Sequence, residues 1–458
     1  MIMKTKLLIQ VTPLIVSLLL FSSCKDYLEE KSDKSLITPS TVEDLQALLD
    51  DAVTMNTATP GFMETCSDDY FLLPATYNAL TSLQVSLYCY KPFPYEYGND
   101  WSKSYQVVYN SNVCLERLED IEQTVVNKLA RDNVKGSALF FRSYYYLLLA
   151  WQHAKAYDTS TASTDLGIVL RANSDFNVPS VRASVEETYG QVIEDTKAAV
   201  PLLPEHPIHV MRPSRAAAYG LLARTYLSMS LPDSAYKYAD LALGIKSSLM
   251  DYNGDPDLNG SVTAAVPFKK FNSETLFYSE MFSSFGLHHP ARGKIDSILY
   301  NSYDTNDLRK EAFFRPNSGY HQFKGSYAAS ASILFSGIAV DELYLIRAET
   351  NARLGKIDEA MDDLNTLLKM RWKNNVDYPV FTAENAEDAL AIVLLERRKE
   401  LLMRGLRWID IKRLNKEGSN IVPTRVVNGE TFSLQPNDSL YALPLPDDII
   451  RLTGIEQN

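Results

Sequence analysis

The chain has 458 residues, of which 57 are acidic and 45 are lysine or arginine, giving a formal net charge of -12 at pH 7. Such an acidic chain is poorly matched to phosphate-rich partners, so the composition argues against nucleic-acid binding. Four cysteines are too few for a disulfide-rich scaffold, and the length suffices for one large domain or two to three smaller ones.

Residues 1–23 are typical of an export signal peptide. Lys4 and Lys6 form a short basic start, a mostly apolar run follows, and two serines precede Cys24. The apolar run is shorter than the roughly 20 residues of a membrane helix, and it is interrupted by polar residues and a proline. We therefore predict cleavage after residue 23 and lipidation of Cys24. An ordinary secretory signal with an incidental cysteine is the alternative.

Residues 50–100 are expected to be irregular, because they are rich in aromatic, proline, asparagine and glycine residues. Long loops usually carry function or are disordered, and so many rings argue against disorder. Sugars present flat C–H faces that stack on aromatic rings, whereas their hydroxyls need polar partners. Any one ring more often packs in a core, but the loop as a whole is a candidate ligand site. Its candidate residues are Tyr88, Tyr90, Phe93, Tyr95, Tyr97 and Asn99.

Three amphipathic stretches, 101–120, 137–157 and 184–203, predict helices from apolar residues spaced three and four apart. The next segment, 212–243, has the spacing of a helix–turn–helix tetratricopeptide unit, with Ala223 and Ala235 where the two helices would touch. Such pairs cannot bury their apolar faces alone, so they are expected to stack on neighbours.

Residues 244–336 form a second segment that is expected to be irregular. Its candidate ligand residues are His288, His289, Arg292 and Tyr320. Adjacent histidines point apart on most backbones, so a shared metal ion is not expected. The sequence contains no metal-binding signature, glycine-rich phosphate loop or nucleophile elbow. We therefore predict a protein without metal, cofactor or enzymatic activity.

The twelve-residue alanine spacing recurs in 341–368, between Ala348 and Ala360, which predicts a second helical pair. Residues 386–414 follow as a further predicted helix that carries the densest cluster of charges in the chain. An arginine-rich helix is able to clamp an anionic ligand. Salt bridges are the preferred interpretation, because the acids lie three or four residues from the arginines.

The last segment, 417–458, contains Asn428-Gly429 between two short alternating runs, which predicts a β-hairpin. The predicted fold class is therefore mostly α. Tetratricopeptide-like helical repeats lie mainly within 101–246 and 339–414. Segments 50–100, 244–336 and 417–458 together form an irregular, loop-rich subdomain. Whether Cys66, Cys89 and Cys114 form a disulfide bond stays open.

DELYLIRAETNARLGKIDEAMDDLN (341–365) followed by AIVLLERRKELLMRGLRWIDIKRL (391–414) resembles the C-terminal hallmark of the SusD/RagB family. DWSKSYQVVYNSN (100–112) and ALFFRSYYYLLLAWQHAKAYD (138–158) are similar to its first helices, in the same order. Of the family's glutamate-glycine-histidine-arginine run, Gly405 and Arg407 are present. The resemblance implies one mostly helical domain over residues 24–458.

It also implies a lipoprotein that sits over a TonB-dependent outer-membrane transporter and holds oligosaccharide or peptide on its irregular side. Asp26, Glu29 and Glu30 are similar to the signal that sends Bacteroidetes lipoproteins to the cell surface. The leading hypothesis is a glycan-binding protein that delivers nutrient to this partner. A peptide or glycopeptide binder, a surface glycosidase and a tetratricopeptide scaffold are the alternatives.

Overall fold

The computed structural model describes residues 39–96, 98–282 and 286–458. The predicted signal peptide, Cys24 and the acidic residues after it lie outside the described residues, as does Tyr97. Residues Val42–Asn458 pack as one unit, to which all of the following refers. Within the described part of the chain, no helix has both the length and the apolar character needed to span a bilayer.

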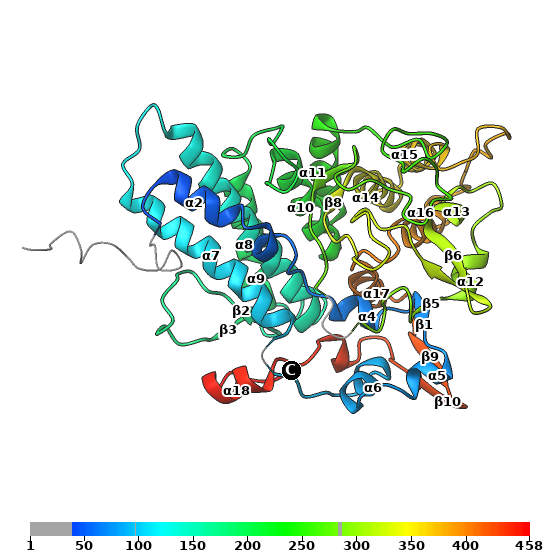
Figure 1. Cartoon of the computed structure of the whole chain (residues 1–458), viewed down its shortest axis with the longest axis horizontal. Coiled ribbons are helices and arrows are strands. Elements are labelled where there is room, and N and C mark those ends of the chain that lie inside the picture. Colours follow the sequence, from blue (N-terminus) through cyan, green and yellow to red (C-terminus); the bar gives the residue numbers. More distant parts are fainter. Residues whose placement is uncertain (1–38, 97, 283–285) are drawn as a thin grey trace, which may run out of the picture. The chain divides into compact units, whose positions relative to one another are not determined.

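Helices dominate this unit, as predicted, and the longer ones pack on their neighbours in chain order (Figure 1). Side-chain caps set some of their first turns: the Asn99 carboxamide accepts a hydrogen bond from the Ser102 amide, and the Ser184 hydroxyl accepts one from Glu187. The longer helices are α7 (Asp100–Asp120), α8 (Lys128–His153), α9 (Val185–Ala199), α10 (Arg215–Ser228), α11 (Pro232–Ile245), α14 (Val340–Arg353), α15 (Ile357–Lys369), α16 (Ala386–Glu400) and α17 (Arg407–Lys416).

Both predicted tetratricopeptide-like pairs are confirmed as packed helical hairpins, α10 with α11 and α14 with α15. Ala223, Ala235, Ala348 and Ala360 are all fully buried, as expected where two helices approach closely. α11 also packs on α14, so the second hairpin continues the stack begun by the first.

Several helix boundaries differ from the predictions, and α8 and α9 each end four residues before the predicted end. The prediction of one helix over 386–414 is wrong, because α16 ends at Glu400 and α17 begins at Arg407. Met403 and Gly405 have φ values of 59° and 75°, which a right-handed helix cannot contain. α8 begins at Lys128, nine residues before the predicted start at 137. The prediction missed its first turns because they are largely exposed and polar and lack an apolar stripe.

The three irregular segments contain only short helices and short strands. The strands pair in two-stranded antiparallel sheets. β1 pairs with β5 and β4 pairs with β8, so these sheets join parts of the chain that are far apart in sequence. The predicted hairpin is confirmed as β9–β10, with Asn428 and Gly429 both at positive φ. The short elements are α2 (Val42–Leu49), α3 (Ala52–Met55), α4 (Phe62–Cys66), β1 (Tyr70–Phe71), α5 (Pro74–Tyr77), α6 (Ser82–Tyr88), β2 (Leu166–Val169), β3 (Arg182–Ser184), β4 (Thr275–Phe277), β5 (Lys294–Ile295), α12 (Ser297–Asn301), α13 (Arg309–Phe313), β6 (Phe314–Asn317), β7 (Tyr320–Phe323), β8 (Ile338–Ala339), β9 (Thr424–Val427), β10 (Glu430–Ser433), the 3₁₀ turn η3 (Ser439–Tyr441) and α18 (Asp447–Thr453).

The irregular segments have an apolar core of their own, which explains why they are ordered without long helices or strands. Rings such as Tyr252, Phe268 and Phe313 pack together there, apart from the larger core between the helices. Cys66, Cys89 and Cys114 are free thiols and all three are buried. Burial raises the pKa of the Cys66 thiol to about 12, so this thiol stays protonated at neutral pH.

Glu64 of α4 is a buried carboxyl group that meets the break between α16 and α17. Its Oε2 accepts a hydrogen bond from the Gly405 amide at 2.8 Å, and its Oε1 accepts one from the Ser67 hydroxyl at 3.1 Å. Burial, reinforced by the nearby Asp69 carboxylate, raises the pKa of Glu64 from 4.5 to about 8. The folded chain therefore keeps a proton at Glu64 that the unfolded chain has released.

A Glu64→Gln variant is expected to be less sensitive to pH than the wild type. Between pH 5 and 8 the folded state binds the extra proton, so the Glu64 contribution to stability falls as pH rises through this window. Glutamine reproduces the protonated group, and its advantage over the wild type should grow to a few kcal/mol, by order of magnitude, at pH 8. Urea unfolding at pH 5, 6.5 and 8 measures this. A pH-independent difference between the two proteins would contradict the expectation.

Candidate ligand-binding surface

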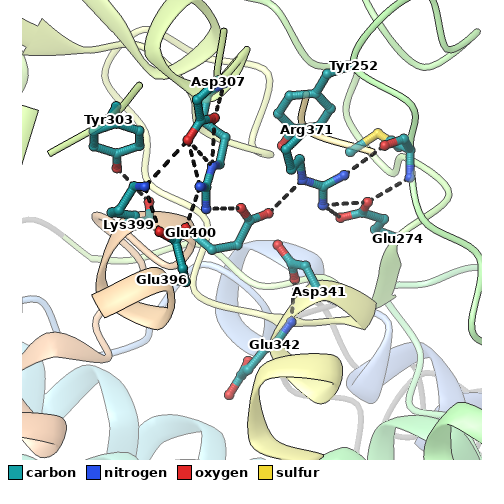
Figure 2. Close-up of polar contacts among 12 residues, drawn as sticks. Tyr252, Glu274, Tyr303, Asp307, Asp341, Glu342, Arg371, Glu396, Lys399 and Glu400 are labelled. Atoms are coloured by element: carbon teal, nitrogen blue, oxygen red, sulfur yellow. Dashed lines mark hydrogen bonds and ion pairs between the residues drawn. The ribbon is translucent and has the colours of Figure 1, made fainter. Parts of the chain in front are cut away.

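A buried network of charged side chains joins segment 244–336 to the helices (Figure 2). Arg371, just after α15, donates hydrogen bonds to Glu400 of α16 at 2.9 Å and to Glu274, just before β4, at 2.8 Å. Arg309 donates to the other oxygen of Glu400 at 3.1 Å, so this carboxylate bridges two guanidinium groups. Asp307, Glu396 and Lys399 complete the network, and every member is at most 5% exposed.

The charged cluster of 386–414 forms salt bridges, as the sequence indicated. Arg397 pairs with Asp410 at 2.8 Å, which links α16 to α17 across the break. Arg407 donates to Asp68 at 2.6 Å and Arg398 donates to Asp69 at 2.8 Å, which holds the chain before β1 against both helices. These bonds, with those of the buried network, fix the irregular side to the repeat side.

The aromatic candidates near residue 90 mostly serve packing. Phe93 and Tyr95 are each 5% exposed and meet the edge or face of Phe62 at centroid distances of 5.8 and 5.3 Å. Asn99 is buried as the cap of α7. The side chains of these three residues are therefore largely occupied by partners inside the protein, although Phe93 also lines a surface pocket next to residues 439–447.

Tyr88 and Tyr90 belong to an aromatic box around a buried cation. The Arg425 guanidinium lies 4.6 Å from the Tyr88 ring centroid, 4.7 Å from that of Tyr70 and 5.7 Å from that of Tyr90. Arg425 also donates to the backbone carbonyls of Ser67 and Tyr70. Tyr88 is 1% exposed, and Tyr90 is only partly exposed. This box joins the β9–β10 hairpin to residues 65–90, so its rings serve mainly to hold the hairpin in place.

His288 and His289 differ in their surroundings. His288 is buried, with its Nδ1 2.8 Å from the Thr65 hydroxyl, and burial lowers the pKa of the imidazole to about 4. His289 is half-buried, and Arg292, which is exposed, donates its amide to the His289 carbonyl at 2.8 Å. Within the described ranges, no group of three or more histidine, cysteine or carboxylate side chains is arranged to hold a metal ion.

Among the candidate rings that the structure describes, Tyr320 is the most exposed to solvent, at 40%. Its ring meets Phe71 edge to face at a centroid distance of 5.0 Å. Phe71 pairs with Lys294 in the β1–β5 sheet, and β5 packs beside β7, which brings the chain around 289–292 towards Tyr320. We define the Tyr320 surface as Phe71, His289, Arg292, Asn317 and Tyr320.

Sequence reasoning selected three of these five residues and missed Phe71 and Asn317 as candidates. Phe71 follows Tyr70 in the aromatic-rich segment. Nothing in the sequence shows that the Phe71 ring is partly exposed whereas the Tyr70 ring is buried. Asn317 ends β6, and its amide donates to the Ala291 carbonyl at 3.5 Å. A partly exposed ring pair, an exposed guanidinium side chain and an amide are groups that can bind a sugar ring and its hydroxyls.

The fold defines a class of helical-repeat protein in which stacked helical hairpins carry a loop-rich side. A family model described as "Starch-binding associating with outer membrane" matches residues 26–227, and a model described as "SusD family" matches residues 299–452. The chain belongs to the SusD/RagB family.

Solved structures share the fold over nearly their whole length. A SusD-like carbohydrate binding protein from Bacteroides vulgatus is 20% identical, with a TM-score of 0.67, 91% of this chain covered and 97% of the other. A putative sugar binding protein from the same organism is 18% identical, with a TM-score of 0.73 and coverages of 92% and 99%. A SusD superfamily protein from Bacteroides thetaiotaomicron is 19% identical, with a TM-score of 0.71 and coverages of 91% and 99%. No curated protein matches the chain significantly.

Proposed function

We propose that this chain is the lipid-anchored, cell-surface binding subunit of an outer-membrane uptake system. It captures a nutrient oligosaccharide or polysaccharide and passes it to a TonB-dependent transporter, without making or breaking bonds. The observation that carries the proposal is the Tyr320 surface, where the partly exposed Tyr320–Phe71 ring pair is joined, through the contact of Asn317 with Ala291, to the chain that carries the exposed Arg292. The names of two structural relatives, which describe carbohydrate and sugar binding, support the same ligand class.

Tyr320→Ala is expected to weaken glycan binding roughly tenfold, because it removes the exposed stacking ring of this surface. Gel retardation on a panel of polysaccharides, followed by titration with oligosaccharides of the one that binds, measures the loss. Tyr320→Phe keeps the ring and should bind nearly as well as the wild type. Ile298→Ala, which changes an 82% exposed side chain on nearby α12, serves as the matched surface control.

The same panel separates the other hypotheses. Binding of peptide pools without retardation on any glycan would replace the ligand class with peptide. Release of reducing sugar from a polysaccharide would overturn the proposal that the protein is not an enzyme. Equal binding by Tyr320→Ala and wild type would remove the Tyr320 surface from the proposal.

Cys24→Ser is expected to move the protein from the membrane fraction to the soluble fraction. Thioether and amide-linked acyl chains at a new N-terminal cysteine are the proposed anchor, and serine cannot carry the thioether. Labelling cells with an alkyne-tagged fatty acid should mark the wild type and a Cys89→Ser control but leave Cys24→Ser unlabelled. Co-purification of the wild type with a large outer-membrane barrel protein would identify the transporter. Unchanged fractionation of Cys24→Ser would contradict the proposed anchor.

A further inference from the structure

A cavity of about 280 Å³ lies between the repeat helix α7 and α18 of the irregular segment 417–458, and none of its lining residues belongs to the Tyr320 surface. It is bordered by α7, by the loop between β2 and β3 and by α18, and it is open to solvent on one side. Its volume is just below the range of about 300–1,000 Å³ that small-molecule sites usually occupy. We call it the α7 pocket, and its lining rings are Trp101, Tyr105, Tyr109 and Phe176.

Phe176 is the ring that distinguishes this pocket from an ordinary surface depression. It is 77% exposed at the β2–β3 loop, and it stacks on Tyr109 of α7 with ring centroids 4.9 Å apart and planes 20° from parallel. Single exposed apolar residues are common on protein surfaces and need no explanation. Here the exposed ring is fixed by a second ring at the rim of a cavity that two further rings line, which is a stacking platform.

The loop that carries Phe176 is held to α7 by polar contacts. The Asn112 amide donates to the carbonyls of Arg171 and Asn173 at 2.7 and 3.1 Å. The Arg171 guanidinium spans the loop and donates to the carbonyls of Asp175 and Val178 at 2.6 and 2.7 Å. These bonds fix the platform before any ligand arrives, so little ordering free energy would oppose binding.

The charge of the lining selects among ligand classes. Among the described residues that line the pocket, Arg171 alone is charged, and its donors already point at backbone carbonyls of its own loop. A strongly charged ligand would find no free counter-charge there. Amides and hydroxyls, including Asn173 and Ser180, surround the rings instead.

We propose that the α7 pocket is a second saccharide site, which takes one or two units of a neutral glycan by stacking a sugar ring on Phe176. The ligand class rests on the proposed function, but the site is separate from the Tyr320 surface and uses none of its residues. A platform of this kind on the helical side would hold a second stretch of a long glycan while the first is bound.

Fluorine NMR of full-length mature protein labelled with 5-fluorotryptophan tests the site directly. Of the four tryptophans, Trp101 lines the pocket, whereas Trp151, Trp372 and Trp408 do not. Maltose, cellobiose, xylobiose and mannobiose are each titrated, with free indole and a glucuronic acid disaccharide as comparison ligands. Trp101→Phe assigns the resonance.

We expect at least one neutral disaccharide to shift the Trp101 resonance saturably and leave the other three in place. Phe176→Ala should weaken this binding roughly tenfold, whereas Phe176→Tyr and Tyr320→Ala should leave it unchanged. Because Phe176 is so exposed, its substitution should not affect folding, which an unchanged melting temperature checks.

No shift with any of the four sugars, a shift with indole alone, or equal affinity of Phe176→Ala would overturn the second site. If polysaccharide retardation that depends on Tyr320 persists in that case, only this inference fails. If retardation is absent as well, the proposed function fails with it.

Discussion

Arg371→Ala is expected to destabilise the protein by about 3–5 kcal/mol, the range for removal of one partner from a buried ion pair. Arg371 is fully buried between Glu274 and Glu400, and it also donates to the Met250 carbonyl at 2.7 Å. Alanine would leave two carboxylates and a carbonyl without this donor, and water cannot replace it at such depth. Chemical denaturation with urea measures the change in free energy of unfolding.

The loss should depend on pH in a definite direction. Burial raises the pKa of Glu274 to about 7 even with Arg371 beside it, and removal of the guanidinium would raise it further. The folded variant would then hold protons that the unfolded chain releases, so its deficit should be larger at pH 8 than at pH 5.

Arg117→Ala is the matched control for Arg371→Ala. Arg117 pairs with Asp120 at 3.3 Å on the surface, where both side chains are about half exposed or more, and such pairs contribute about 0–1 kcal/mol. If Arg371→Ala were no more destabilising than this control, the network in Figure 2 would not anchor the irregular segment.

Arg425→Ala is expected to destabilise the irregular side by at least about 3 kcal/mol. The guanidinium donates to the carbonyls of Ser67 and Tyr70, and each buried group left unpaired costs about 1–3 kcal/mol. Its cation–π contacts with Tyr70 and Tyr88 would be lost as well, and the aromatic box would collapse or fill with water.

The Arg425 effect should be local as well as large. Hydrogen exchange is expected to rise most at β1 and β5, which flank the box and carry Phe71, and less at α10 and α11. Glycan binding at the Tyr320 surface should weaken in parallel. Arg425→Lys should recover little of the lost stability. One ammonium group cannot replace the planar guanidinium, which donates to two carbonyls and lies against three rings. Full rescue by lysine would show that charge alone matters there.

The helical half of the molecule was predictable because its signal is local. The spacing of Ala223 and Ala235, and of Ala348 and Ala360, follows from helix geometry within some 30 residues and needs no knowledge of the rest of the chain. The break at Met403 to Gly405 was missed because apolar and charged residues keep a helical period through it. Gly405 is the residue that could have indicated this break, because glycine commonly adopts positive φ where a helix ends.

The irregular half was predictable in extent but not in geometry. β1 pairs residue 70 with 295, and the rings of Tyr88 and Tyr90 are covered by an arginine from residue 425. Such pairings are set by tertiary packing, which composition does not encode. Aromatic density therefore identified the segments that build the surface, whereas the exposed ring of Tyr320 had to be separated from buried rings by the fold. Phe176 lies in the β2–β3 loop without aromatic neighbours in sequence, so aromatic density did not indicate it as a ligand-binding candidate.

Glu400 accepts hydrogen bonds from two arginines that come from different parts of the chain, Arg309 of the irregular segment and Arg371 after α15. Exposed loop stretches between such anchoring bonds are therefore able to change in length or in side chains while the helical scaffold keeps its shape. Exchange of chain within residues 310–337, between Arg309 and β8, is accordingly a practical route to adapt the same helical scaffold to a different ligand.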